Sequence, residues 1–338
     1  MSTGILTLMS FEHLSQLGAV TAFDPKQLIG IPFALVGAIF MSVGAQMQHR
    51  GVSKVGSASG GLEHSGLNFR HLVLLFKRPS WVFGSALLGF AIVFQLVSLG
   101  FSPLIVVQPI GAVALVMTSI LNSRISKTHL NKMSKWAVAL CVGGIGIFVA
   151  IAAFTAVNAP MEAQDLVEIQ AILIVVLIIF AIVYWRFRKK ASALFYIVGA
   201  GVLYGFVATL AKVIITRILD GATDWLTWAC LLSLLLAAGL GALFVQNAYS
   251  TGPPDLVIAG LTVIDPIVAV TIGIVILDEA SQAPGWAIGA FVIAGLIAVA
   301  GVFLLAKYHP NVSEELATAL KESTPRESPQ SPQGTSVK

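Results

Sequence analysis

Long apolar segments alternate with short polar segments along most of the 338-residue chain. In a helix, about 20 apolar residues cross the roughly 30 Å hydrocarbon core of a bilayer. The pattern therefore predicts an all-α polytopic membrane protein with about nine transmembrane helices. The predicted spans are 28–47, 80–100, 103–122, 136–156, 169–186, 193–216, 226–248, 256–277 and 285–306.

The composition is that of a membrane protein. Hydrophobic residues make up 57% of the chain and charged residues 11%, and the mean hydropathy is +0.90. Soluble domains carry about 25% charged residues, so this chain has too few polar side chains to face water on all sides. Its two cysteines, Cys141 and Cys230, lie in apolar segments without metal or disulfide spacing.

Basic residues are distributed unevenly between the two sides of the predicted bundle. Of the 20 Lys and Arg residues, three (Lys26, Lys212 and Arg217) fall on the side of the N-terminus, and the other 17 fall on the opposite side. Cytoplasmic loops are enriched in Lys and Arg. The bias predicts a plasma (cytoplasmic) membrane protein with its N-terminus outside and its C-terminus in the cytoplasm. It also explains the basic composition without nucleic acid as a partner.

Three segments are predicted to lie outside the spans. Residues 1–27 form an external N-terminal segment that lacks the basic start of a signal peptide, and we expect an interfacial helix there. The stretch LNFRHLVLLFKRPSW at 67–81 is amphipathic and is expected to lie at the cytoplasmic interface. Residues 309–338 are rich in Pro, Ser, Glu and Gln, which predicts a disordered cytoplasmic tail.

The two halves of the chain resemble each other in sequence. The segment VVQPIGAVALVMTSILN (106–122) matches VIDPIVAVTIGIVILDE (263–279), and FQLVSLG (94–100) matches VQNAYSTG (245–252). These matches predict a first four-span repeat at 28–156, a linking span within 157–190, and a second four-span repeat at 191–308. Equivalent spans lie five crossings apart, so the repeats are inverted, which is typical of secondary transporters that alternate access around a midplane site.

The same segments resemble the drug/metabolite transporter superfamily with EamA-like repeats. The chain is most similar to the branch of NIPA magnesium transporters and actinobacterial-type permeases, through LGFSPLIVVQPIGAVALVMTSILNSRIS (99–126), VQNAYSTGPPDLVIAGLTVIDPIVAVTIGIVILDE (245–279) and the glycine-rich GWAIGAFVIAGLIAVAGVFLL (285–305). The resemblance implies a transporter with a central cavity between its repeats. NIPA-like proteins carry a threonine before the two prolines, where this chain has Gln108 and Asp265.

Asp265 is the strongest candidate for a functional residue. It lies about nine residues into its span, roughly 14 Å along the helix and near the midplane. An acid there costs about 2.5–3.5 kcal/mol on insertion scales and usually faces a cavity or a partner. Two functional interpretations stay open, a proton carrier and a cation ligand; Asp265 is the predicted metal ligand if the cargo is a metal ion. The structural interpretation is a protonated acid bonded to a neighbouring helix.

Other residues of the predicted transport pathway lie in the repeated segments. Pro109 and Pro266 each remove a backbone hydrogen bond and free a carbonyl one turn earlier, at Ile105 and Thr262. Such carbonyls bind substrates in broken helices, although prolines also produce simple kinks. The neutral polar members either line the pathway or bridge helices: Gln95, Gln108, Gln246 and Asn247.

Three charged residues near span ends receive structural interpretations. Lys212 is expected to extend its ammonium group toward the outer surface, with pairing to an acid or an anion as the alternative. Asp278 and Glu279 are expected to form a solvated edge, with a vestibule for cations as the alternative. Tyr204, near the middle of its span, is expected to be a packing residue.

Together these features predict a secondary transporter that moves a small molecule or a cation through the lipid bilayer by alternating access, with proton coupling as one option. The alternatives are a Mg²⁺ or other divalent-cation transporter, a lipid-linked flippase, and a non-transporting membrane scaffold. No phosphate loop, HExxH, GxSxG or metal-spaced Cys/His set occurs in the sequence. We therefore expect neither an enzyme nor a cofactor, and a homodimer is left open.

Overall fold

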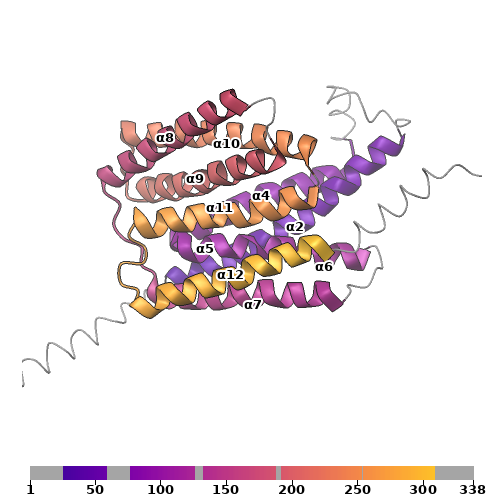
Figure 1. The fold of residues 1–338 in the computed structure, drawn as a ribbon, viewed down its shortest axis with the longest axis horizontal. Helices are drawn as coiled ribbons and strands as arrows, with labels where there is room; N and C mark the ends of the chain where they lie inside the picture. Colours follow the sequence, from indigo (N-terminus) through magenta and orange to yellow (C-terminus); the bar gives the residue numbers. More distant parts are fainter. Residues whose placement is uncertain (1–25, 59–76, 126–131, 188–191, 253, 309–338) are drawn as a thin grey trace, which may run out of the picture.

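The described part of the structure, a computed structural model, consists of helices joined by short turns (Figure 1). It comprises residues 26–58, 77–125, 132–187, 192–252 and 254–308. The predictions for the N-terminal segment, for most of residues 67–81 and for the C-terminal tail lie outside these residues. The helices are α2 (Gln27–Ala58), α4 (Pro79–Phe101), α5 (Leu104–Gly111), α6 (Val113–Ile125), α7 (Lys132–Thr155), α8 (Ala163–Phe187), α9 (Ala193–Leu219), α10 (Trp225–Thr251), α11 (Pro254–Val275) and α12 (Gly285–Tyr308).

Nine helical segments of the described residues are long and apolar enough to cross a membrane, with α5 and α6 together forming one of them. This result confirms the prediction of an all-α polytopic membrane protein. Exposed side chains agree with a bilayer around the bundle, because α8 presents a row of isoleucines (Ile174, Ile178, Ile179 and Ile182) to its surroundings. Exposed tryptophans, which favour the interface between membrane and water, lie near both ends of the bundle: Trp225, Trp228 and Trp286 near one end, and Trp136 and Trp185 near the other.

The helices differ most from the predicted spans in two places. Helix α2 continues to Ala58, eleven residues beyond the predicted end at 47; the polar segment that follows contains no proline, and the helix runs through Gly51 and Gly56. The predicted span 103–122 is divided into α5 and α6 at Ala112. The N–H of Ala112 donates to the carbonyl of Pro109 at 3.2 Å, three residues back, which is the tighter hydrogen-bond pattern of a 3₁₀ turn.

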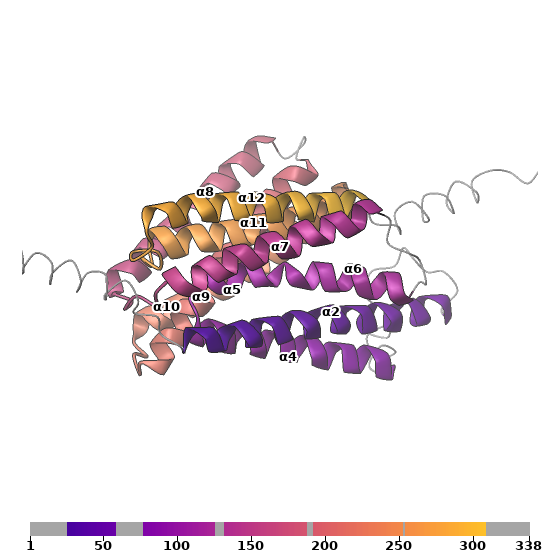
Figure 2. The same cartoon turned by 90° about the horizontal axis from the view of Figure 1, so that it is seen from below.

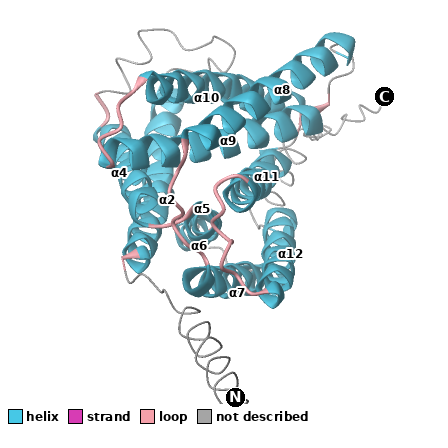
Figure 3. Cartoon of the chain, turned by 90° about the vertical axis from the view of Figure 1, so that its left-hand side faces the viewer, coloured by secondary structure: helices cyan, strands magenta, loops and turns pink. Residues whose placement is uncertain are grey.

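The helices pack in neighbouring groups around the α5–α6 span. Helix α2 packs along α4, α9 packs against both α10 and α11, and α7 packs along α12. The α5–α6 span lies between these groups and contacts α2, α7 and α11 (Figures 2 and 3). Equivalent helices of the two predicted repeats, α5 with α11 and α7 with α12, therefore contact each other. A two-fold relation would produce such contacts, and the repeat itself stays a prediction.

Helix α8, which occupies the predicted linking span, lies at the edge of the bundle (Figure 1). It is held to α10 by a polar contact in which the hydroxyl of Ser233 donates to Oε1 of Gln170 at 2.6 Å. The amide of Gln170 also approaches the sulfur of Cys230 at 3.5 Å. Polar groups that bridge helices in this way stabilise packing within a membrane.

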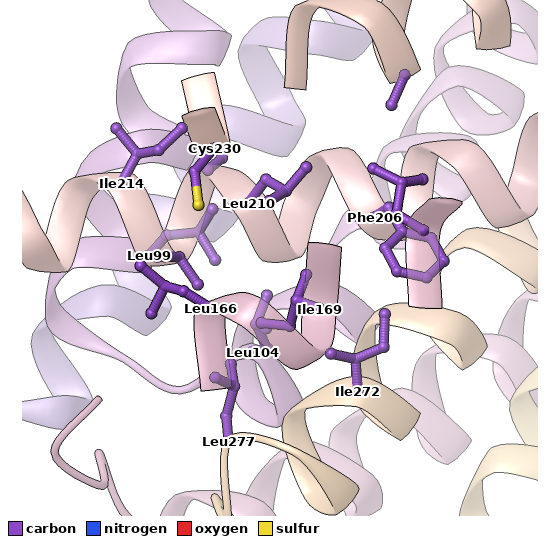
Figure 4. Close-up of a cluster of buried hydrophobic side chains, with 14 of the residues drawn as sticks. Leu99, Leu104, Leu166, Ile169, Phe206, Leu210, Ile214, Cys230, Ile272 and Leu277 are labelled. Carbon is purple, nitrogen blue, oxygen red and sulfur yellow. The ribbon is translucent and has the colours of Figure 1, made fainter. Parts of the chain in front are cut away.

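The two ends of the bundle differ in character. At one end, called here the turn end, short turns at 102–103, 156–162, 220–224 and 276–284 join the helices. The other end, called the basic end, carries Arg78, Arg124, Lys132, Arg186 and Lys307. The largest apolar cluster includes Leu99, Leu104, Leu166, Leu210 and Leu277, from both halves of the chain (Figure 4). This cluster surrounds the turn between α4 and α5.

Candidate functional site

Close packing of α11 against α9 fixes the position of Asp265. A Cβ atom at Gly205 of α9 would lie 2.6 Å from Cβ of Val268 and 3.1 Å from the carbonyl oxygen of Asp265. A Cβ atom at Gly201 would lie 2.6 Å from Cβ of Ile264. Because no side chain fits between the two backbones at these points, the glycines bring the middle of α11 directly against α9.

One oxygen of the Asp265 carboxylate is buried without a hydrogen-bond partner. This atom is Oδ1, and among the described residues it is the one buried side-chain nitrogen or oxygen atom without such a partner. Burying an unpaired polar or charged group is costly, and native proteins pair the great majority of such groups. The exception marks Asp265 as a group that can accept a hydrogen bond or a positive charge from a ligand.

One tyrosine lies near Asp265 on a neighbouring helix, and a second tyrosine lies near the first. Tyr204 of α9 lies within range of electrostatic interaction with both Asp265 and Tyr249 of α10. The ring of Tyr204 also packs on α10, where its Cε1 atom is 3.0 Å from the position of a Cβ at Gly241. Tyr204 therefore packs as expected, and it also approaches the acid. Tyr249 was not predicted, because its interaction with Tyr204 depends on how α9 and α10 are placed.

An apolar pocket of about 110 Å³ lies between α5–α6, α7, α11 and α12. Pro109 and Pro266 both line it, together with Phe148, Thr262, Val270 and Gly295. The residues that the repeat pairs with each other thus meet at one pocket. Asp265 is not among the lining residues; it precedes Pro266 and so points about 100° away around the helix.

The structure places the remaining predicted pathway residues apart from this pocket. Gln108 is buried on α5 and Gln95 is half-buried on α4, whereas Gln246 and Asn247 are exposed on α10. The amide of Asn247 donates to the carbonyl of Leu243 in its own helix at 2.7 Å. Within the described residues, none of the four forms a hydrogen bond with Asp265. Helix α11 continues through Pro266, and the other interruption falls at Ala112, so neither helix is broken at its proline.

Lys212 does not extend toward the surface as predicted. Its side chain is 3% exposed, at the turn end of α9. The ammonium group donates to the carbonyls of Leu99 at 2.8 Å and Ser102 at 2.9 Å, and to Oδ1 of Asn158 at 2.8 Å. These three acceptors use all three donors of a lysine. Buried acceptors from the α4–α5 turn hold the lysine inside the protein, which the position of Lys212 in its own helix did not indicate.

The prediction of a solvated edge is wrong for Glu279, while Asp278 is exposed as expected. Glu279 is 2% exposed. Its Oε1 accepts from the N–H of Leu104 at 2.7 Å and its Oε2 accepts from the N–H of Ile105 at 2.9 Å. Burial raises the pKa of Glu279, whereas Lys212 and the two N–H groups act in the opposite direction. The carboxylate therefore caps the first turn of α5.

The described residues contain no group of three or more His, Cys, Asp or Glu side chains that could hold a metal ion. Among the described residues, a cation at Asp265 would thus meet at most one further His, Cys, Asp or Glu side chain, with neutral oxygens as its other ligands. Oxygen ligands of this kind suit Mg²⁺, which usually keeps several waters when a protein binds it. They equally suit a protonated amine or a proton.

These observations define a multi-pass membrane protein with nine candidate spans among its described residues and, in the middle of one of them, an acid whose buried Oδ1 has no hydrogen-bond partner. The chain is similar to an uncharacterized protein of Corynebacterium glutamicum, with 26% identity over 290 residues, covering 83% of this chain and 96% of the relative. No protein-family model matches the chain. No solved structure matches it either.

Proposed function

We propose that the protein is a secondary transporter of the drug/metabolite transporter type, which moves a small solute across the cytoplasmic membrane by alternating access. One observation carries the proposal: the buried Oδ1 of Asp265, in the middle of a span, has no hydrogen-bond partner among the described residues. Acidic residues inside membranes are rare and mark substrate or ion pathways and proton relays. Asp265 is accordingly the group that binds a proton or a positively charged cargo.

The surroundings of Asp265 support this role over a purely structural one. A structural acid in a membrane would donate or accept a hydrogen bond to a neighbouring helix, and the buried oxygen of Asp265 does neither. The resemblance of residues 99–126 and 245–279 to the drug/metabolite transporter superfamily points the same way. The excess of basic residues on one side favours an external N-terminus and a cytoplasmic C-terminus.

Transport of Mg²⁺ or another divalent cation is the second candidate. The same unpaired carboxylate favours it, because a divalent cation bound there would supply the missing charge. Metal-dependent thermal stabilisation of the purified protein that vanishes in Asp265→Asn would support this candidate. Retained stabilisation in that variant would place the metal elsewhere.

The test is flux into proteoliposomes under an imposed pH gradient, with cargo chosen by a thermal-shift screen of amines, metabolites and divalent cations. The variant Asp265→Asn keeps the size of the side chain but removes the charge, so we expect it to lose the response to the gradient. Asp278→Asn is the matched control, because Asp278 is exposed and its φ of 50° suits asparagine as well as aspartate. Full pH-dependent flux by Asp265→Asn would refute the proposal.

A further inference from the structure

The helical structure is interrupted between α4 and α5, where Ser102 and Pro103 separate two helices that meet at the turn end. Each helix terminus leaves up to four backbone groups without a partner inside its helix. The N–H groups of Val106 and Val107 bond to the carbonyl of Pro103, both at 3.1 Å. Partners from elsewhere are needed for the N–H groups of Leu104 and Ile105 and for several carbonyls at the end of α4.

Two charged side chains supply these partners, and both belong to the second half of the chain. Lys212 of α9 binds the carbonyls of Leu99 and Ser102 at the end of α4, and Glu279 of the α11–α12 turn binds the first two N–H groups of α5. The charges match the helix ends, because a helix C-terminus attracts cations and an N-terminus attracts anions. Each contact joins residues more than 100 positions apart.

Both charges lie in an apolar environment. Leu99 and Leu104, whose backbone groups they bind, belong with Leu210 and Leu277 to the largest apolar cluster of the described residues (Figure 4). Removing one partner of such a contact leaves a buried polar group unpaired. The contacts therefore hold the two halves together strongly at this end, and water does not replace them while the cluster stays closed.

The equivalent junction at the basic end is held differently. There the carbonyl of Asn247, at the end of α10, accepts from the hydroxyls of Ser250 at 2.8 Å and Thr251 at 2.7 Å. The carbonyl of Ala248 accepts from the N–H of Gly252 at 2.9 Å. These partners belong to α10 itself or to the residue that ends it, so they do not resist movement of one half against the other.

We propose that Lys212 and Glu279 form a latch that closes the turn end of the transport pathway. The proposal rests on the proposed function, because a latch matters only where the two halves move against each other. Opening the turn end requires the ammonium group to leave its three acceptors and the carboxylate to leave its two N–H donors. These contacts make the state closed at the turn end the resting state.

The test measures the access of water to each end with two reporter cysteines. Cys141 and Cys230, both buried and free, are first replaced by alanine. The turn-end reporter is Thr209→Cys, because Thr209 is fully buried one helical turn inward from Lys212. The second reporter, in a separate protein, is Gln246→Cys, at a residue of the predicted transport pathway that is exposed toward the basic end of α10. Labelling rates with a charged methanethiosulfonate reagent are measured in detergent, where both ends meet the reagent.

Two substitutions release the latch while preserving side-chain shape. Lys212→Met removes the ammonium group, and Glu279→Gln replaces an acceptor by a donor that faces an N–H group. Because hydrogen bonds to charged groups are among the stronger ones, we expect labelling of Thr209→Cys to rise at least about tenfold. Labelling of Gln246→Cys should fall, since alternating access closes one end when the other opens. Lys135→Met, at an exposed lysine of the basic end, should change neither rate.

Faster labelling of both reporters would show that the contacts only stabilise the fold. An unchanged labelling rate of Thr209→Cys would show that the contacts do not limit opening. Either result overturns the latch. If the two variants fail to fold, Asn158→Ala decides, because it removes one of the three acceptors of Lys212 from an exposed turn. It should raise labelling of Thr209→Cys by a smaller factor, and an unchanged rate would also refute the latch. Labelling needs no cargo, so a chain that transports but shows no reciprocal change refutes the latch and leaves the proposed function standing.

Discussion

Gly144 offers a sharp test of how the bundle is packed, because a single methyl group at this position has no room. A Cβ atom at Gly144 of α7 would lie 2.6 Å from the backbone nitrogen of Ala298 in α12 and 2.9 Å from the carbonyl oxygen of Ala294. Backbone atoms cannot rotate away as a side chain can. In Gly144→Ala the two helices must therefore separate, which also weakens the contact of Phe148 with Phe291, whose ring centroids are 4.9 Å apart.

The magnitude follows from comparison with neighbouring glycines. Gly143 and Gly146 lie in the same helix, and a Cβ atom at either position meets nothing within 4 Å. Replacement of glycine by alanine inside a helix gains up to about 1 kcal/mol from backbone entropy, and this gain applies equally to all three positions. Overpacking costs about 1–3 kcal/mol. We therefore expect Gly144→Ala to be about 1–3 kcal/mol less stable than Gly143→Ala or Gly146→Ala.

The free energy of unfolding is measured by titrating the protein from mild detergent micelles into SDS and following its circular dichroism. The controls should be as stable as the original chain or slightly more stable. A value for Gly144→Ala within about 0.5 kcal/mol of both controls would contradict the close α7–α12 contact, because the overpacking penalty would then be missing.

Two further predictions concern contacts that hold α8 and α10 in place. Ser233→Ala removes the hydrogen bond to Gln170 and should cost roughly 1 kcal/mol of stability in the same titration. The control Ser250→Ala loses only a bond within its own helix and should change stability less. Equal losses in the two variants would argue against the α8–α10 bridge. Partial desolvation raises the pKa of Asp224, but hydrogen bonds from Thr227 and Arg217 outweigh it and place the pKa below the ordinary 3.8. Because the pKa of Asp224 is lower in the folded state, ionised Asp224 contributes fully to folding stability above pH 3.8. This contribution is lost only as the pH falls through the folded-state pKa. The difference in Tm between the original chain and Asp224→Ala should therefore be constant from pH 7 to pH 5, and a difference that already shrinks in that range would contradict the lowered pKa.

The spans were predictable because one physical requirement dominates them. In the absence of water, backbone groups must bond within their own segment, so each apolar run of sufficient length becomes a helix. The sequence did not show where α2 ends, since a polar segment without proline can continue a helix beyond the membrane. It also did not show the break at Ala112, because the proline that precedes the break is matched by Pro266, where α11 continues without interruption. Local composition alone does not distinguish a kinked helix from a divided one.

The candidate site was predictable only in part. Asp265 stands out in the sequence because no other acid lies in the middle of a predicted span, and the structure adds that its Oδ1 is buried without a partner. The interaction of Tyr249 with Tyr204 depends on α10 lying beside α9, which periodicity does not reveal. Gln246 was paired with Gln95 by the repeat, yet it is exposed while Gln95 is half-buried. Sequence equivalence in a repeat therefore does not imply equal surroundings.

The buried charges show why the acids of this chain must be judged by their hydrogen bonds and not by their sequence neighbours. Glu279 follows Asp278 at the end of a span and looks like part of a solvated edge, but its two oxygens are taken by N–H groups 174 and 175 residues away. Lys212 is likewise fully paired by acceptors from the α4–α5 and α7–α8 turns. Both residues thus complete the ends of helices, a need that only the folded chain creates. Asp265 has no such role, because it lies in the interior of α11, away from either end of the helix. With the carboxylate of Glu279 already paired, the Oδ1 of Asp265 is the buried acidic oxygen left without a hydrogen-bond partner among the described residues.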